Sequence, residues 1–194
     1  MPDDGAATAA WAGLARGATA DLTGWTPSGP EQTALRAEYL ALLDARGGDA
    51  VRRDGGPEHL TVSGFVLSPD LAHVLLCLHR KGGFWVQTGG HMEPGDATPA
   101  QAALREAREE SGIADVALAL PGAVDVDRHA LGAAFGRCRE HWDVGYALVA
   151  DAGAATAVSD ESHDVAWFAV DALPDGAVAD LPRRLARVRA ALRT

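Results

Sequence analysis

The sequence is poor in cysteine and aromatic residues, and it has no long hydrophobic run. Only two of its 194 residues are cysteines, Cys77 and Cys138, and they lie far apart in the chain. Two distant cysteines predict no disulfide framework, so we expect both thiols to be reduced. No apolar run approaches the roughly 20 residues needed to cross a bilayer, which excludes a membrane-spanning protein.

Positive charge is scarce as well. The chain has 17 Lys and Arg against 27 Asp and Glu, a formal net charge of −10. This balance argues against nucleic-acid binding, because a phosphate backbone binds best to a basic surface. A phosphate-bearing small molecule stays open as a substrate, since a bound divalent cation can reverse the local field. The opening residues MPDDGAATAA lack the basic start and apolar stretch of a secretory signal, so we expect a cytoplasmic protein.

An N-terminal extension precedes one catalytic domain in this interpretation, with the boundary between residues 1–57 and 58–194. Residues 1–28 are rich in Ala, Gly, Asp and Thr, which predicts an arm that is weakly ordered or packs late in folding. From Pro30 the spacing of Leu and Tyr side chains predicts one amphipathic helix, which ends at Gly47.

The catalytic domain mixes strands and helices. Predicted strands lie at residues 60–67, 73–79, 84–87, 124–129, 141–149 and 165–170. Predicted helices lie at residues 99–111 and 181–192, the second with Asp180 as its N-cap. Strands outnumber helices in a mixed order, which predicts an α+β fold with helices packed on a sheet. A solvated face is expected to hold the arginines of the last helix, Arg183, Arg184, Arg187, Arg189 and Arg193.

The helix over residues 99–111 carries the strongest chemical signal. Thr98 suits its N-cap, Pro99 its first position, and Gly112 the left-handed residue after its end. One side is expected to be buried: Ala100, Leu104, Ala107 and Ser111.

A different face of this helix gathers three carboxylates. Glu106, Glu109 and Glu110 follow the i, i+3, i+4 spacing, at which like charges repel by a few tenths of a kcal/mol for each pair. A hard divalent cation would remove that repulsion, and Mg²⁺ suits carboxylates combined with phosphate oxygens. The competing interpretation is an ordinary solvated face, which Arg105 and Arg108 would partly neutralise. Gly89, Gly90 and Gly95 before the helix favour the metal site, because glycines permit positive φ and close approach of the main chain.

Here the sequence resembles the Nudix box, G-x5-E-x7-R-E-U-x-E-E-x-G-U, where U is a bulky apolar residue. It reads Gly90, five residues, Asp96, eight residues, and then the stretch REAREESGI, residues 105–113. The second half matches at every charged and glycine position, although Ala107 is smaller than the usual aliphatic residue. Further landmarks of the family are found in residues 58–175, at His59-Leu60-Thr61 and after the strand that holds Trp167. The resemblance implies an α/β/α sandwich with a mixed sheet.

The same resemblance implies a reaction and its residues. A Nudix protein of this kind hydrolyses a pyrophosphate bond in a nucleoside diphosphate linked to another group, with Mg²⁺, or Mn²⁺ in its place. The implied metal ligands are Glu106, Glu109, Glu110 and the Gly89 carbonyl. The general base is either a box glutamate or a later loop residue, for which Glu161 is the candidate. Asp96 is expected to brace Arg105, with a shorter arm and one extra residue compared with the box.

Two weaker hypotheses concern polar residues beside the helix. Asp125, Asp127 and His129 share one strand face, as do His141 and Asp143 on the next strand, and together they could form a substrate wall. Arg80 is a further candidate for phosphate contact. A zinc site at Cys138, His141 and His129 is the second hypothesis, but three scattered ligands are too few for a closed structural site.

Other interpretations keep the fold and change the function. Some Nudix relatives are isoprenoid-diphosphate isomerases, which would be expected to carry a catalytic cysteine, whereas Cys77 is expected in the core. Others sense a ligand without turnover and have no need of all three glutamates. The expected partners are a nucleotide-derived diphosphate and, as in many relatives, a second copy of the chain, with no nucleic acid and no membrane. An interaction module on the N-terminal helix is possible only as an addition to these functions.

Overall fold

A computed structural model describes residues 4–132, 138–160 and 162–193 of the chain. The chain forms two compact units, and each is built from three separate stretches of sequence. Unit 1 consists of Met1–Val62, Gly90–Ala102 and Gly122–Gly145. Unit 2 consists of Ser63–Gly89, Ala103–Pro121 and Tyr146–Thr194.

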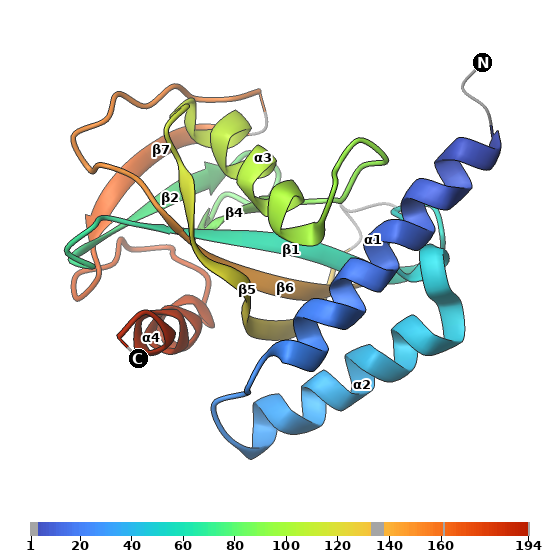
Figure 1. The fold of residues 1–194 in the computed structure, drawn as a ribbon. Helices are drawn as coiled ribbons and strands as arrows, with labels where there is room; N and C mark the ends of the chain where they lie inside the picture. The colour runs from blue at the N-terminus through green and yellow to red at the C-terminus, as the bar shows by residue number, and fades with distance from the viewer. Residues whose placement is uncertain (1–3, 133–137, 161, 194) are drawn as a thin grey trace. The chain divides into compact units, whose positions relative to one another are not determined.

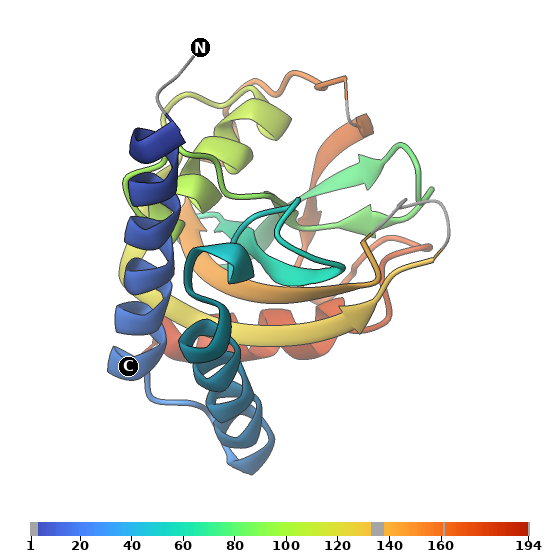
Figure 2. The same cartoon turned by 90° about the vertical axis from the view of Figure 1, so that its right-hand side faces the viewer.

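The N-terminal extension contains one more helix than the sequence predicts. Helix α1 spans Asp4–Gly24, and α2 spans Pro30–Arg46 and is followed by a 3-10 turn, Gly47–Ala50. Figures 1 and 2 both show α2 turning back from the end of α1. The expectation of a weakly ordered arm over residues 1–28 is therefore wrong. Alanine is the best helix former, and Leu14, Ala18 and Leu22 recur at i, i+4 and i+8 to form a buried stripe.

Helix α2 is joined to two strands of unit 1 by a buried tyrosine. The Tyr39 hydroxyl lies 2.7 Å from the Asp127 carbonyl oxygen on β5 (Ala117–Ala130) and 3.0 Å from the Asp143 carbonyl oxygen on β6 (Glu140–Val149). The Tyr39 ring also packs on Trp142, with ring centroids 5.0 Å apart. Tyr39 thus combines a large apolar contact with a satisfied hydroxyl, as buried tyrosines usually do.

The strands form one seven-stranded sheet in the order β3-β2-β1-β6-β5, with β4 beside β1 and β7 beside β2. The strands not yet introduced are β1 (Glu58–Leu67), β2 (His73–His79), β3 (Trp85–Val86), β4 (Thr88–Gly90) and β7 (Ser162–Ala169). β2 pairs antiparallel with β1, β3 and β7. The predicted α+β class and mixed sheet are confirmed. β5 is longer than the predicted strand at residues 124–129, because it begins at Ala117.

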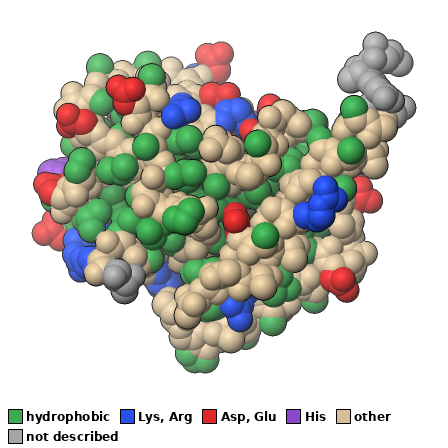
Figure 3. Space-filling view, viewed as in Figure 1, with side chains coloured by type: hydrophobic (Ala, Val, Ile, Leu, Met, Phe, Trp, Pro, Cys, Tyr) green, Lys and Arg blue, Asp and Glu red, His purple; other side chains and the backbone are tan. Residues whose placement is uncertain are grey.

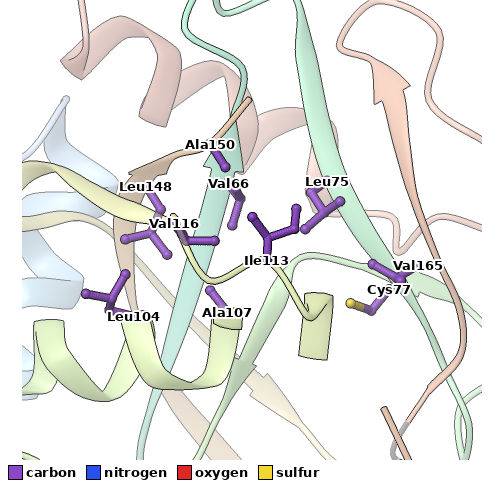
Figure 4. Packing of buried hydrophobic residues seen from close by; sticks show 10 residues of the cluster. All are labelled: Val66, Leu75, Cys77, Leu104, Ala107, Ile113, Val116, Leu148, Ala150 and Val165. Carbon is purple, nitrogen blue, oxygen red and sulfur yellow. The ribbon is translucent and has the colours of Figure 1, made fainter. Parts of the chain in front are cut away.

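Unit 2 has its own hydrophobic core, drawn in Figure 4. Helix α3 (Pro99–Ser111) places Leu104 and Ala107 against Val66 of β1 and Leu148 of β6. The predicted buried side of α3 is confirmed, since Ala100, Leu104, Ala107 and Ser111 are all buried. Small residues on this side let the helix approach the sheet closely, which fixes where its remaining faces point.

The last helix, α4 (Leu181–Ala191), corrects the expectation of a solvated arginine face at Arg184, whereas Arg183 is exposed as expected. Arg184 is only 1% exposed, and its guanidinium carbon lies 5.1 Å from the centre of the Phe65 ring. Phe65 neighbours Val66 in β1, so the two side chains point to opposite faces of the strand. Within unit 2, α4 therefore contacts the face of β1 that α3 does not cover. Asp180 precedes α4 as predicted, but its side chain makes no capping hydrogen bond.

Charged groups are spread thinly over the face drawn in Figure 3. Lys and Arg side chains stand there in separate small groups among apolar and uncharged polar atoms. Within the described ranges, no helix has the length and apolar character needed to cross a membrane.

Candidate functional site

The ends of α3 are set by local chemistry, as predicted. The Thr98 hydroxyl oxygen accepts the N–H of Gln101 at 3.1 Å, which caps the first turn. Gly112 follows the last turn with φ of +70°, a left-handed conformation that favours glycine. These two signals position the glutamates along the helix.

The three glutamates of α3 lie in different surroundings. The side chain of Glu106 is 13% exposed and that of Glu109 is 59% exposed. Glu110 is buried, at 7% exposure, and its Oε2 accepts the N–H of Gly89 at 2.9 Å. A buried carboxylate requires such a partner, because desolvation penalises an uncompensated charge. Glu110 is therefore held in place, whereas Glu109 reaches solvent.

One arginine nitrogen joins the other two glutamates. Arg105 Nη1 lies 3.0 Å from Glu106 Oε1 and 3.1 Å from Glu109 Oε2. Two carboxylates of α3 thus converge on a single positive charge, which offsets their repulsion. Arg108 does not share this role in the way the sequence suggested, since its Nη2 donates to the Val116 carbonyl at 2.9 Å.

Of the glycines before α3, Gly89 makes a close main-chain approach, whereas Gly95 has open space around its Cα. Gly89, Gly90 and Gly95 are absent from the positive-φ glycines of the described chain, so this part of the expectation is wrong. Gly89 instead brings its amide to the Glu110 carboxylate. The predicted role of the Gly89 carbonyl as a metal ligand stays a prediction.

Asp96 and Glu161 are the two remaining residues of the predicted catalytic site. Asp96 Oδ2 accepts the N–H of Glu93 at 2.7 Å and so closes a turn in the loop before α3. Its predicted pairing with Arg105 stays a prediction. Glu161, the candidate base from the later loop, lies outside the described residues.

The residues of the predicted substrate wall differ in how deeply they are buried. Asp125, Asp127 and Asp143 are all buried, and Asp143 Oδ1 accepts the hydroxyl of Thr61 at 2.9 Å. His129 is exposed, and its Nδ1 lies 3.3 Å from Asp127 Oδ2. Arg80 belongs to unit 2, where its Nη2 lies 3.5 Å from the Ser162 carbonyl. Asp143 and Arg80 thus each have a contact within the protein, and their predicted place in a substrate wall stays a prediction.

His141 belongs to a cluster that sequence reasoning found only in part. Its neighbours are His59, His91 and Cys138, and the potential ligand atoms of all four residues lie within 4.8 Å of one another. Among the described residues, this is the one group of three or more His, Cys, Asp or Glu side chains that meets so closely. His129, the third ligand that the sequence suggested, is not a member. His59 and His91 were missed because no regular spacing joins them to the Cys138-His141 pair.

Burial keeps the three clustered imidazoles neutral. Desolvation, together with a smaller effect of the neighbouring histidines, lowers the pKa of His91 to about 3 and that of His141 to about 4. Desolvation also lowers the pKa of His59. A neutral imidazole keeps a lone pair on one nitrogen, which is the form that binds metals.

The two groups of potential ligands differ in chemistry. The α3 group offers carboxylate oxygens, which are hard donors suited to Mg²⁺ or Mn²⁺. The histidine and cysteine group offers nitrogen and sulfur, which suit zinc and its neighbours. The α3 glutamates fit the metal that the Nudix resemblance implies, because two of them already converge on one cationic group.

Solved structures of other proteins share the fold of this chain. The fold resembles a NUDIX family hydrolase from Clostridium perfringens, with a TM-score of 0.55, 24% identity, and coverage of 70% of this chain and 96% of that chain. It also resembles the E. coli dihydroneopterin triphosphate pyrophosphohydrolase, with a TM-score of 0.54, 16% identity, and coverage of 69% and 94%. A C. elegans Ap4A hydrolase, solved as a binary complex, gives a TM-score of 0.53, 17% identity, and coverage of 69% and 97%.

These similarities establish the fold, because the identities are too low to transfer an activity. No protein of curated function matches the sequence. Residues 57–189, well over half of the chain, match the model of the NUDIX domain. The helices α1 and α2 precede this matched region. The chain therefore belongs to the Nudix family, as its box sequence and α+β fold both indicate.

Proposed function

We propose that this protein hydrolyses a pyrophosphate bond in a nucleoside diphosphate linked to another group, with Mg²⁺ as its metal and Mn²⁺ as a substitute. The observation that carries the proposal is the convergence of Glu106 and Glu109 on one cationic group, beside a Glu110 held by a main-chain amide. Family membership supports the reaction class, because Nudix proteins are typically metal-dependent pyrophosphohydrolases. Residues 58–194 would form the hydrolase domain, and residues 1–57 its extension.

The three glutamates would hold the metal. When bound, the ion supplies positive charge that neutralises the pyrophosphate oxygens and polarises the phosphorus under attack. Glu110 is pre-organised by its hydrogen bond to Gly89, so its carboxylate needs little reordering. Glu106 and Glu109 would exchange the Arg105 guanidinium for the ion, which frees Arg105 to pair with Asp96 or with a substrate phosphate.

The proton of the attacking water needs an acceptor. Glu109 is the most exposed of the three glutamates, so it suits both metal binding and proton transfer. Glu161 is the alternative acceptor, and a Glu161→Gln variant separates the two. If Glu161 is the base, kcat falls while the affinity for Mg²⁺ stays the same.

The residues of the Nudix box indicate that a pyrophosphate bond is cleaved, and they do not indicate which group leaves. The solved relatives include an Ap4A hydrolase and a dihydroneopterin triphosphate pyrophosphohydrolase, whose named substrates share a phosphoanhydride bond and differ in the rest of the molecule. We therefore assign this chain the bond, with a nucleotide-derived diphosphate as the substrate class.

One experiment tests the proposal. The full chain is incubated with Mg²⁺ and with a panel of nucleotide sugars, dinucleoside polyphosphates, ADP-ribose, NADH and oxidised nucleotides, and the phosphate-bearing products are counted. Hydrolysis of at least one compound that is lost on chelation of Mg²⁺ supports the proposal. Binding of a panel compound with no turnover would instead favour a ligand sensor.

An isomerase function receives less support from the structure. An isoprenoid-diphosphate isomerase would be expected to use a reactive cysteine, and Cys77 is 1% exposed in the core of unit 2. Burial also raises the pKa of its thiol, which keeps it protonated.

A further inference from the structure

We propose that His59, His91, Cys138 and His141 form a second metal site, which binds a zinc-class ion through three imidazole nitrogens and one thiolate. The site is independent of the proposed hydrolase function, because its donors are nitrogen and sulfur rather than carboxylate oxygen. All four residues belong to unit 1.

The four donors come from three separate stretches of the chain. His59 lies near the start of β1, His91 directly follows β4, and Cys138 and His141 flank the start of β6. Their potential ligand atoms lie within 4.8 Å of one another. Ligand bonds of about 2.0–2.3 Å in a tetrahedron place donors roughly 3.3–3.8 Å apart, so only a small contraction would close the site.

The three rings surround a common point. The ring centroids are 5.1 Å apart for His59 and His91, and 5.2 Å apart for each of the other two pairs. A near-equilateral arrangement of imidazoles provides three corners of a tetrahedron. Cys138, which is also buried, supplies the fourth corner.

A hydrogen bond determines which nitrogen of His59 is available to bind a metal. His59 Nδ1 lies 3.2 Å from the Gly56 carbonyl oxygen, so Nδ1 carries the proton and donates a hydrogen bond to that oxygen. This contact leaves the lone pair of neutral His59 on Nε2, which lies 3.0 Å from His91 Nε2. Metal-bound histidines typically have their second nitrogen fixed by such a carbonyl.

One ring nitrogen of His141 is left unsatisfied within the protein. Its Nε2 is buried and has no hydrogen-bond partner in the described part of the chain. A buried nitrogen without a partner costs free energy, and a bound cation would satisfy it.

The donor set selects the ion and its role. Three imidazoles and one thiolate match the tetrahedral preference of Zn²⁺ and do not suit Mg²⁺ or Ca²⁺. Four protein ligands leave no open position for a substrate, which indicates a structural ion. The ion would tie together the start of β1, the loop after β4 and the start of β6.

The test uses the full-length chain, stripped with a chelator and then titrated with Zn²⁺ or Co²⁺ in an excess of Mg²⁺, which keeps the carboxylate site occupied. We expect one tightly bound ion per chain. The Co²⁺ form should show the intense visible bands of tetrahedral coordination together with a thiolate-to-cobalt charge-transfer band. An octahedral spectrum without a thiolate band, or no tight binding in Mg²⁺ excess, would overturn the proposal.

Variants identify the ligands. Cys138→Ser should abolish the charge-transfer band, and His91→Gln should weaken Zn²⁺ binding by about 10-fold or more. The matched controls are Cys77→Ala, the other cysteine, and His129→Ala, an exposed histidine whose ring centroid lies 5.7 Å from that of His141. Both controls should bind Zn²⁺ like the unchanged chain. If His129→Ala loses as much affinity as His91→Gln, the assigned ligand set is wrong.

Misfolding of a variant has to be distinguished from loss of a ligand. Circular dichroism of the stripped proteins serves this purpose, because the unchanged chain and Cys138→Ser should have the same helix content before metal is added. Zn²⁺ should then raise the melting temperature of the unchanged chain and not that of Cys138→Ser. An equal rise in both would contradict a role for Cys138.

Discussion

The side-chain amide of Gln32 makes two hydrogen bonds with the main chain of Val126. Gln32 Nε2 donates to the Val126 carbonyl at 2.8 Å, and Gln32 Oε1 accepts the Val126 N–H at 3.1 Å. Gln32 lies on α2 and is 2% exposed, whereas Val126 lies on β5, the last strand in the sheet order. The amide takes the place of a neighbouring strand and covers part of the sheet edge.

Replacing Gln32 by Ala should lower the free energy of unfolding by about 1–3 kcal/mol. The variant leaves a buried N–H and a buried C=O of Val126 without a partner, and each such group costs free energy. Urea unfolding followed by circular dichroism measures the change. Asp44→Ala on the exposed face of α2 is the control, with an expected change below about 0.5 kcal/mol. Equal stability of the two variants would mean that the amide contributes nothing.

Glu109→Gln and Glu110→Gln should each lower kcat by about 100-fold or more, because even indirect partners of a metal ligand typically cost about 10- to 100-fold. Glutamine keeps the shape of both side chains, and its carbonyl can still accept the Gly89 N–H at position 110. Steady-state kinetics on the best panel substrate measures the effect. Glu31→Gln, an exposed acid in the first turn of α2, serves as the control and should retain full activity. Unchanged turnover in both box variants would refute the assigned metal ligands.

Arg184→Ala should destabilise the protein far more than Arg183→Ala, although the two arginines are neighbours. Arg184 is buried over the Phe65 ring, and its Nη1 lies 3.9 Å from Asp180 Oδ2. Arg183 is exposed. We expect a loss of about 2–4 kcal/mol at Arg184, from the packed stem and the desolvated cation–π contact. The change at Arg183 should stay within about 0.5 kcal/mol. Thermal unfolding of both variants makes the comparison, and similar melting temperatures would contradict it.

Gly112→Ala should destabilise the end of α3. The residue has φ of +70°, and an added Cβ would lie 2.6 Å from Ala157 Cβ and 2.9 Å from Ala157 N. The left-handed conformation alone costs an alanine about 1 kcal/mol, and the contact with main-chain atoms adds to that cost. Gly95→Ala is the matched control, because no atom lies within 4 Å of its added Cβ. Chemical denaturation of the two variants should differ by more than about 1 kcal/mol; equal midpoints would argue against strain at Gly112.

Cys77 should not react with iodoacetamide in the folded protein at pH 8. Its side chain is buried and its pKa is raised, chiefly by desolvation, so the thiolate is almost absent at that pH. Mass spectrometry of peptides after short exposure measures the modified fraction. Alkylation in denaturant provides the positive control, since both cysteines become accessible there. Rapid modification of Cys77 in the folded state would show that this part of the core opens readily.

The box helix illustrates what could be predicted from local sequence. Its limits, its cap at Thr98, its left-handed Gly112 and its buried side all follow from short-range rules, because helix ends and periodicity depend on nearby residues. Burial of Glu110 and the contact with Gly89 did not follow from those rules. The two residues are 21 positions apart, and only the packing of α3 brings them together.

The amino-acid sequence alone determined the family, the α+β class, most of the strands and the carboxylate helix, since each depends on periodicity or on a motif of fixed spacing. Tertiary structure decided which polar groups are buried together. It ordered α1 by burying its leucines, buried Arg184 over Phe65, and joined Gln32 to Val126 across 94 positions of sequence. It also brought His59 and His91 to Cys138 and His141. Contacts of this kind arise from how strands of different sequence position are placed side by side, and no local pattern of residues encodes them.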